Sequence, residues 1–128
     1  MEFIKNFRII SEKLSYFREK DIKLVTGINY YIDYNENGDE VSFLEVAYIL
    51  EPIKVNGDRY KLLLKFNEVT SLNITNFGGA FNQMIGFKIT DMKDRNWESS
   101  HRYYVHDYEN DTMNFYCKSI SALLFEKL

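Results

Sequence analysis

The first candidate for a functional site is the stretch 31–45, which partly matches the ligand pattern of a calcium-binding loop. Four residues of "YIDYNENGDEVSFLE" fit the first, third, fifth and sixth positions of an EF-hand loop: Asp33, Asn35, Asn37 and Gly38. The twelfth position should be a bidentate glutamate, but it is Leu44, and Glu45 comes one residue later. Because the closing carboxylate is missing, we expect neither a bound metal nor a cofactor.

The residues before this loop alternate with the period of a β-strand, whereas an EF-hand needs helices. The apolar residues at every second position are Ile28, Tyr30, Ile32 and Tyr34. Asn37-Gly38 favours a two-residue type I′ turn, because both residues tolerate positive φ. That turn would pair Glu36 with Asp39 and place Ile32 opposite Phe43. The sequence therefore predicts a β-hairpin.

A single cysteine and two histidines are the other candidates for catalysis. With a turn at Asn110-Asp111, His106 would lie diagonally from Cys117 on one face of a second hairpin. Diagonal neighbours on a sheet are about 7–8 Å apart, so a Cys–His dyad is disfavoured and a buried structural cysteine is expected. His101 and His106 are five residues apart and would point to opposite faces of a strand. We find no catalytic constellation and predict that the protein is not an enzyme.

Length and composition predict one soluble domain spanning residues 1–128. The chain is 45% hydrophobic and 27% charged, and no apolar run approaches the roughly 18 residues of a membrane span. The segment "MEFIKNFRII" lacks the apolar core of a secretory signal. A lone cysteine agrees with a reducing compartment, so we expect a cytoplasmic protein.

The distribution of charge indicates what kind of partner to expect. The net charge of −3 disfavours nucleic acid. Residues 29–58 hold seven acids and one base, a local charge of −6. Acids gather at solvated turns for structural reasons, but they also form docking faces for basic partners. The candidate partner-binding residues, all near predicted turns or loops, are Asp33, Glu36, Asp39, Glu40, Asp94, Trp97 and Glu98. Trp97 could anchor an interface or cover one end of the core.

The order of elements predicts an α+β fold. Apolar residues at steps of four and three predict an N-terminal amphipathic helix that ends near residues 19–21: Phe3, Phe7, Ile10, Leu14 and Phe17. Asn-Gly pairs at 37–38 and 56–57 predict a three-stranded meander, followed by strands in "VTSLNI" and "MIGFKITDM" and by the second hairpin. We expect the helix to pack on a predominantly antiparallel sheet of about six to seven strands.

Several segments together resemble a known class of bacterial proteins. The segments "LLLKFNEVTSLNI", "IGFKITD" and "RYYVHDYENDTMNFYCKSI" are similar to small immunity proteins that Gram-positive bacteria encode beside polymorphic toxins. The resemblance spans most of residues 59–120. It implies a non-enzymatic inhibitor that binds a toxin, and an acidic face would suit a basic toxin. A small-ligand-binding β-sheet domain with a concave aromatic surface is the alternative that the sequence leaves open.

Overall fold

The computed structural model describes residues 3–52, 57–93 and 101–128, which are mostly β: 57% strand and 7% helical. The elements, in chain order, are β1 (Ile4–Lys5), α1 (Arg8–Ser11), the 3-10 helix η1 (Glu19–Asp21), β2 (Ile22–Tyr34), β3 (Glu40–Leu50), β4 (Tyr60–Asn67), β5 (Thr70–Ile74), β6 (Asn82–Gln83), β7 (Phe87–Asp91), β8 (Tyr103–Asp107), β9 (Met113–Cys117) and β10 (Ser119–Lys127).

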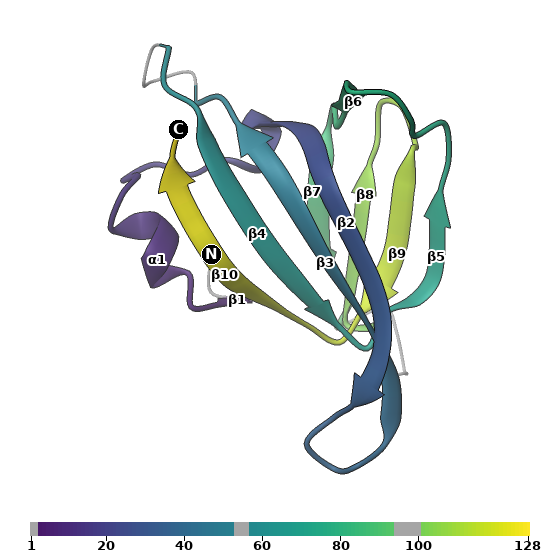
Figure 1. Cartoon of the computed structure of the whole chain (residues 1–128). Coiled ribbons are helices and arrows are strands. Elements are labelled where there is room, and N and C mark those ends of the chain that lie inside the picture. The colour runs from purple at the N-terminus through teal and green to yellow at the C-terminus, as the bar shows by residue number, and fades with distance from the viewer. Residues whose placement is uncertain (1–2, 53–56, 94–100) are drawn as a thin grey trace.

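The strands form two sheets (Figure 1). One sheet has six strands in the order β1-β10-β4-β3-β2-β6, and the other has four in the order β5-β9-β8-β7. All neighbouring strands are antiparallel except β1 and β10. The sheets share one hydrophobic core. Across it, the ring centroids of Phe66 on β4 and Phe115 on β9 are 4.8 Å apart, and those of Tyr48 on β3 and Phe87 on β7 are 5.2 Å apart.

Alternation of buried and partly exposed side chains explains why these segments are strands. In β4, every second residue is buried, namely Tyr60, Leu62, Leu64 and Phe66. The strands β8 and β9 alternate in the same way. A period of two places one side of each strand on the shared core. The predicted meander is confirmed, because β2, β3 and β4 are neighbours in the first sheet.

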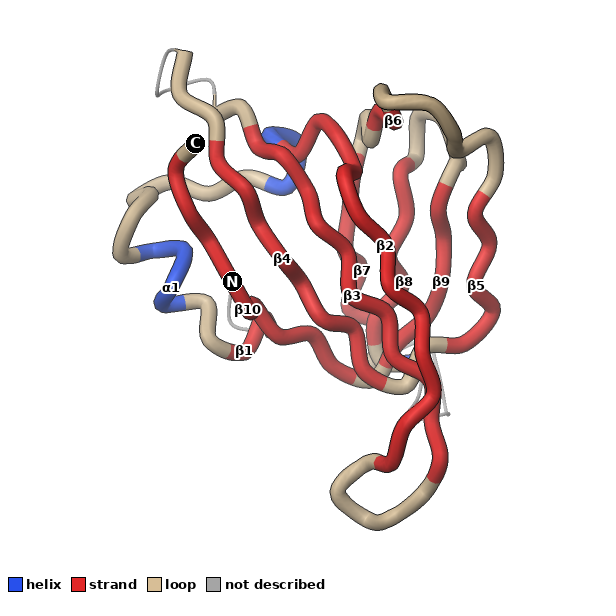
Figure 2. The backbone as a smooth tube through the Cα atoms, viewed as in Figure 1, coloured by secondary structure: helices blue, strands red, loops and turns tan. Residues whose placement is uncertain are grey.

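The predicted N-terminal helix is wrong, and with it the α+β class. No described helix has seven or more residues, and Figure 2 shows only short helical pieces beside the strands. The apolar stripe does reach the core, since Ile10 and Leu14 are buried and Phe3, Phe7 and Phe17 pack against it. Asn6, with φ +61°, interrupts any helix in this segment, and Ile4 instead pairs with Ile120 of β10. The periodic apolar residues therefore marked positions that are buried, but most of the backbone that carries them is irregular.

The β2–β3 hairpin exists as predicted, but its register differs by one residue. Ile32 lies opposite Ser42, and Tyr31 lies opposite Phe43. Only Gly38 of the Asn37-Gly38 pair has positive φ (+81°), so the connection is a three-residue loop and not a type I′ turn. The pairing of β3 with β4 begins at Phe43, and residues 32–42 extend beyond it. These residues, which we call the arm, project from the body (Figure 1).

The β8–β9 hairpin is also one residue out of the predicted register. His106 pairs with Asn114, and Tyr103 pairs with Cys117. The carboxylate of Asp107 is fully buried and organises the turn by accepting hydrogen bonds from the Thr112 amide (3.1 Å), the Thr112 hydroxyl (2.6 Å) and the Met113 amide (2.8 Å). These bonds lengthen the connection beyond the predicted two-residue turn.

Candidate functional site

The turn at the end of the arm is held by its own backbone and by one asparagine. The Asn35 amide donates to the Asp39 carbonyl at 2.9 Å, and the Gly38 amide donates to the Asn35 carbonyl at 3.1 Å. The side-chain oxygen of Asn35 accepts from the amides of Asn37 (2.9 Å) and Asp39 (3.0 Å). This oxygen, which matched a calcium ligand in the sequence, therefore closes the turn.

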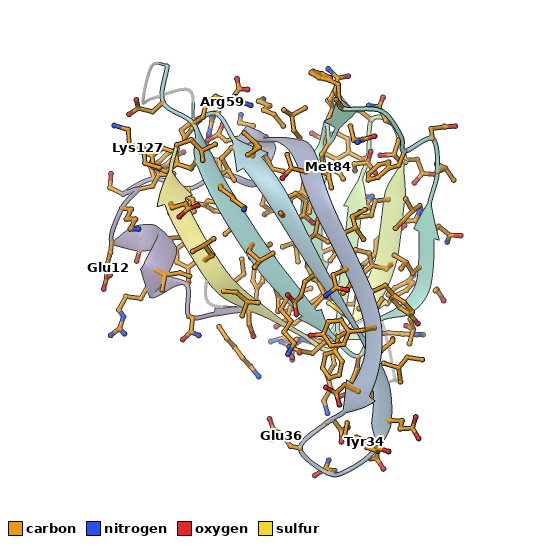
Figure 3. The ribbon with its side chains drawn as sticks, viewed as in Figure 1. Glu12, Tyr34, Glu36, Arg59, Met84 and Lys127 are labelled. Carbon is orange, nitrogen blue, oxygen red and sulfur yellow. The ribbon has the colours of Figure 1, made fainter. Side chains whose placement is uncertain are left out.

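The arm brings four of the predicted partner-binding residues together. Asp33, Glu36, Asp39 and Glu40 are all exposed on it, and Figure 3 shows Glu36 at its end, far from Arg59 and Lys127. Residues 28–42 contain these four acids and no lysine or arginine. The arm therefore carries a compact cluster of negative charge in water. Lys5, Lys65 and Lys118 line the hollow beside its turn together with Glu36, and none of them is ion-paired to it in the described residues.

The other three predicted residues, Asp94, Trp97 and Glu98, lie outside the described residues, so their role stays a prediction. Asp91, the last residue of β7, forms an ion pair with Arg102, which directly precedes β8. Arg102 donates from Nε to Oδ1 of Asp91 at 2.8 Å and from Nη2 to Oδ2 at 3.1 Å. These hydrogen bonds lower the pKa of the Asp91 carboxyl.

A row of exposed apolar side chains on β2 is the main feature that sequence reasoning did not assign. Its members and their exposed fractions are Ile28 (38%), Tyr30 (52%), Ile32 (63%) and Tyr34 (65%). We call these residues the apolar row. Across the hairpin, Val46 and Leu44 lie opposite Ile28 and Tyr30 and are fully buried. The row therefore continues the core-facing side of the sheet outward, past the end of the core.

The period-of-two pattern of the apolar row was visible in the sequence. Its exposure was not, because an alternating pattern normally marks a buried face. Exposed apolar residues beside charged ones are typical of protein-binding surfaces. The apolar row and the four acids of the arm together make the candidate site.

The opposite face of the hairpin is satisfied by contacts within the protein. The rings of Tyr31 and Phe43 stack at 5.4 Å, and the Lys65 ammonium lies 4.7 Å from the Phe43 ring centre. The Tyr31 hydroxyl donates to Oε2 of Glu45 at 2.6 Å. Burial, and then this hydrogen bond, raise the pKa of Tyr31 to about 12. These contacts stiffen the base of the arm.

A hollow of about 650 Å³ lies beside the turn, and its lining combines residues of the arm, including Tyr34 of the apolar row, with residues of β4 and β10. It is lined mainly by polar residues, which include Asn35, Asn37, Lys65, Asn67 and Lys118. Only two aromatic residues, Tyr34 and Phe43, line it. This composition differs from the concave aromatic surface that a small-ligand-binding domain would use.

Cysteine and histidine are separated by the sheet. Cys117 is buried, as predicted, and burial raises the pKa of its thiol well above the ordinary range. His106 lies on the other face of the same sheet, where burial and then the nearby Lys88 lower its pKa. The prediction that the two share a face is wrong, because the register differs by one residue. Within residues 3–52, 57–93 and 101–128, no group of three His, Cys, Asp or Glu side chains could hold a metal ion.

Comparison with known protein families gives a match. The family described as Immunity protein PIM8 matches residues 9–122, a range that includes the arm and most of both sheets. No curated protein and no solved structure matches. The family match agrees with the resemblance that the sequence segments indicated. In the described part of the chain, no helix is long and apolar enough to cross a membrane.

Proposed function

Because the chain belongs to the family of immunity protein PIM8, we propose that it binds a cognate toxin and neutralises it by covering the toxin's surface. The proposed mechanism is stoichiometric, so it needs no catalytic residue. The contact surface that we propose is the arm together with the apolar row.

The observation that carries this assignment is the concentration of negative charge on a projecting element. Four exposed acids lie within the short stretch 33–40, with no lysine or arginine between residues 28 and 42. A negative surface attracts a positive one over a distance of about one Debye length, roughly 10 Å at 0.1 M salt. We therefore propose that the toxin presents a basic surface to the arm.

The apolar row supplies the apolar surface for binding that the acids alone do not provide. Exposed charges mainly accelerate encounter, whereas burial of aromatic and aliphatic side chains provides most of the affinity of an interface. Tyr30 and Tyr34 combine a large apolar ring with a hydroxyl, which suits a surface that is wet when free and dry when bound. In this proposal the acids steer the toxin and the row holds it.

The test is co-expression with the toxin encoded beside this gene. We expect growth to be restored and the two proteins to elute together at equimolar ratio in gel filtration. Titrating purified protein into a fixed amount of toxin should reach full neutralisation near one equivalent. Protection by a small fraction of an equivalent would indicate catalysis instead. Absence of both rescue and a complex would contradict the proposed function.

A further inference from the structure

One edge of β2 is left without a neighbouring strand over most of its length. On one side, β2 pairs with β3 from Ile22 to Tyr34. On the other side, only Leu24 and Val25 pair, with the two residues of β6. In the part of the chain that the structure describes, no strand lies against residues 26–34 on that side. Figure 1 shows this stretch running past β6 toward the arm.

The turn determines which backbone groups this edge presents. Asn35 and Asp39 are hydrogen-bonded to each other, and antiparallel pairs alternate between bonded and non-bonded. The register is regular from Gly27 to Tyr34, so Asp33, Tyr31 and Asn29 bond to β3. The amides and carbonyls of the residues between them point away from β3: Ile28, Tyr30, Ile32 and Tyr34. The hydrogen bond of the Tyr34 amide fits this alternation, because the amide donates to Oδ1 of Asp33 at 2.8 Å and not to a carbonyl of β3.

Ile28, Tyr30 and Ile32 therefore present both unpaired amides and exposed side chains of the apolar row, whereas the Tyr34 amide is already bonded to Asp33. Natural proteins usually protect a sheet edge with lysine, proline or a bulge. Residues 27–34 contain no lysine and no proline, and their pairing with β3 shows no irregularity. The short strand β6 already pairs with the beginning of this edge, so an added strand would extend the pairing along β2.

We propose that an extended segment of the toxin adds to this edge of β2 as a new strand, beside Ile28, Tyr30 and Ile32. The proposal rests on the proposed function and specifies how the partner is held. Main-chain hydrogen bonds would provide affinity, and alternate side chains would provide specificity.

The two faces of β2 define the chemistry of that segment. Side chains on one face would lie beside the apolar row, so they should be apolar. Side chains on the other face would lie beside Asn29, Tyr31 and Asp33 and close to the acidic turn, so they should be basic or polar. The arm favours a basic partner over pairing with the same edge of a second copy, because the arm of that copy would bring its own four acids and no base.

Amide hydrogen exchange measured by NMR tests the proposal on the unmodified protein. In the free protein, we expect the amides of Ile28, Tyr30 and Ile32 to exchange quickly and those of Asn29 and Tyr31 to be protected by β3. In the complex with the toxin, isolated from the co-expressed pair, exchange at the first three should slow by at least tenfold.

Each alternative result has a defined meaning. A complex that forms without protecting these amides overturns strand addition and leaves the proposed function intact. Failure of the two proteins to form any complex overturns the proposed function and this inference with it. Protection in the free protein, together with a dimeric mass, would show that a second copy occupies the edge and would also overturn the proposal.

Two substitutions at one position separate backbone pairing from side-chain contact. Ile32→Ala keeps the outward amide and removes most of the side chain, whereas Ile32→Pro also removes the amide and places a ring at the edge. We expect the alanine variant to bind the toxin about tenfold more weakly and the proline variant at least tenfold more weakly again. Equal weakening, with melting temperatures that match each other, would overturn the role of the backbone.

Discussion

Reversing the charge of the acidic turn tests whether the arm steers a basic toxin. The variant replaces Glu36, Asp39 and Glu40 by lysine. Each replacement adds two positive charges, so the net charge changes from −3 to about +3. None of these carboxylates makes a hydrogen bond or an ion pair in the described part of the chain, so their loss removes no bond that the fold uses.

The expected effect follows from the exposure of these charges. Two unit charges about 10 Å apart in water interact by about 0.4 kcal/mol, and a reversal changes this by about twice as much. Three reversals amount to about 2.5 kcal/mol before screening. Screening over one Debye length leaves about 0.9 kcal/mol at 0.1 M salt, and the longer Debye length at 0.01 M leaves about 1.8 kcal/mol. Association should therefore slow about fivefold at 0.1 M and about twentyfold at 0.01 M.

The measurement is the association rate constant of the toxin against ionic strength, for wild type and variant. A control variant of the same net charge carries lysine at Glu12, Glu51 and Glu126, three exposed acids outside the arm. The first two form ion pairs with Arg8 (3.5 Å) and Arg59 (3.6 Å), and exposed pairs of this kind contribute little to stability. We expect the control to retain a rate close to wild type and the dissociation rates to change little. Equal slowing by both variants would refute steering by the arm. A large drop in the melting temperature of the first variant would show that its acids serve the fold.

Three further predictions concern the scaffold. Asp107→Ala removes a buried acceptor of three hydrogen bonds and should lower the free energy of unfolding by about 2–4 kcal/mol in urea denaturation, and an unchanged midpoint would contradict its role in the turn. The Cys117 thiol should not react with a thiol reagent at pH 8 until the protein unfolds, because burial raises its pKa, so rapid reaction in native buffer would be the contrary result. The pKa of Tyr31, about 12, should fall in the variant Glu45→Gln when the Tyr31 ring signal is titrated by NMR. Because the pKa of Tyr31 is raised in the folded state, the contribution of its protonated form to stability should be full below about pH 10 and lost as the pH approaches 12.

Local patterns in the sequence were sufficient to predict most strands. The alternating residues of β4, β8 and β9 each place one side on the core, and this pattern needs no knowledge of the rest of the fold. The division into two sheets could not be predicted, because it depends on long-range pairing. The strand β10, which the sequence did not indicate beyond residue 120, inserts between β1 and β4.

The false helix shows a limit of periodicity. Steps of three and four residues reported correctly that Ile10 and Leu14 are buried. They did not predict the backbone conformation correctly, because a short helix, a parallel strand pair at Ile4 and an irregular segment together bury the same apolar residues. Tertiary pairing with β10 outweighed the helical pattern.

The two register errors have one cause. Each turn was predicted from its Asn-Gly or Asn-Asp dipeptide, but side-chain oxygens of Asn35 and Asp107 accept backbone amides and make each loop longer. A slip of one residue exchanges the faces of a strand, which is why His106 and Cys117 lie apart. In the candidate site, the exposed acids agreed with the sequence, whereas the free edge of β2 became visible only when its neighbours were known.

The position of the arm has a consequence for the evolution of this protein. Residues 32–42 extend past the last β3–β4 pair, and the arm's turn is closed by its own amides and by Asn35. Substitutions among its exposed side chains should therefore spread through a lineage without damaging the core. We expect such a design to let an inhibitor follow a diverging toxin by altering a few arm residues, while selection on foldability acts mainly on the two sheets.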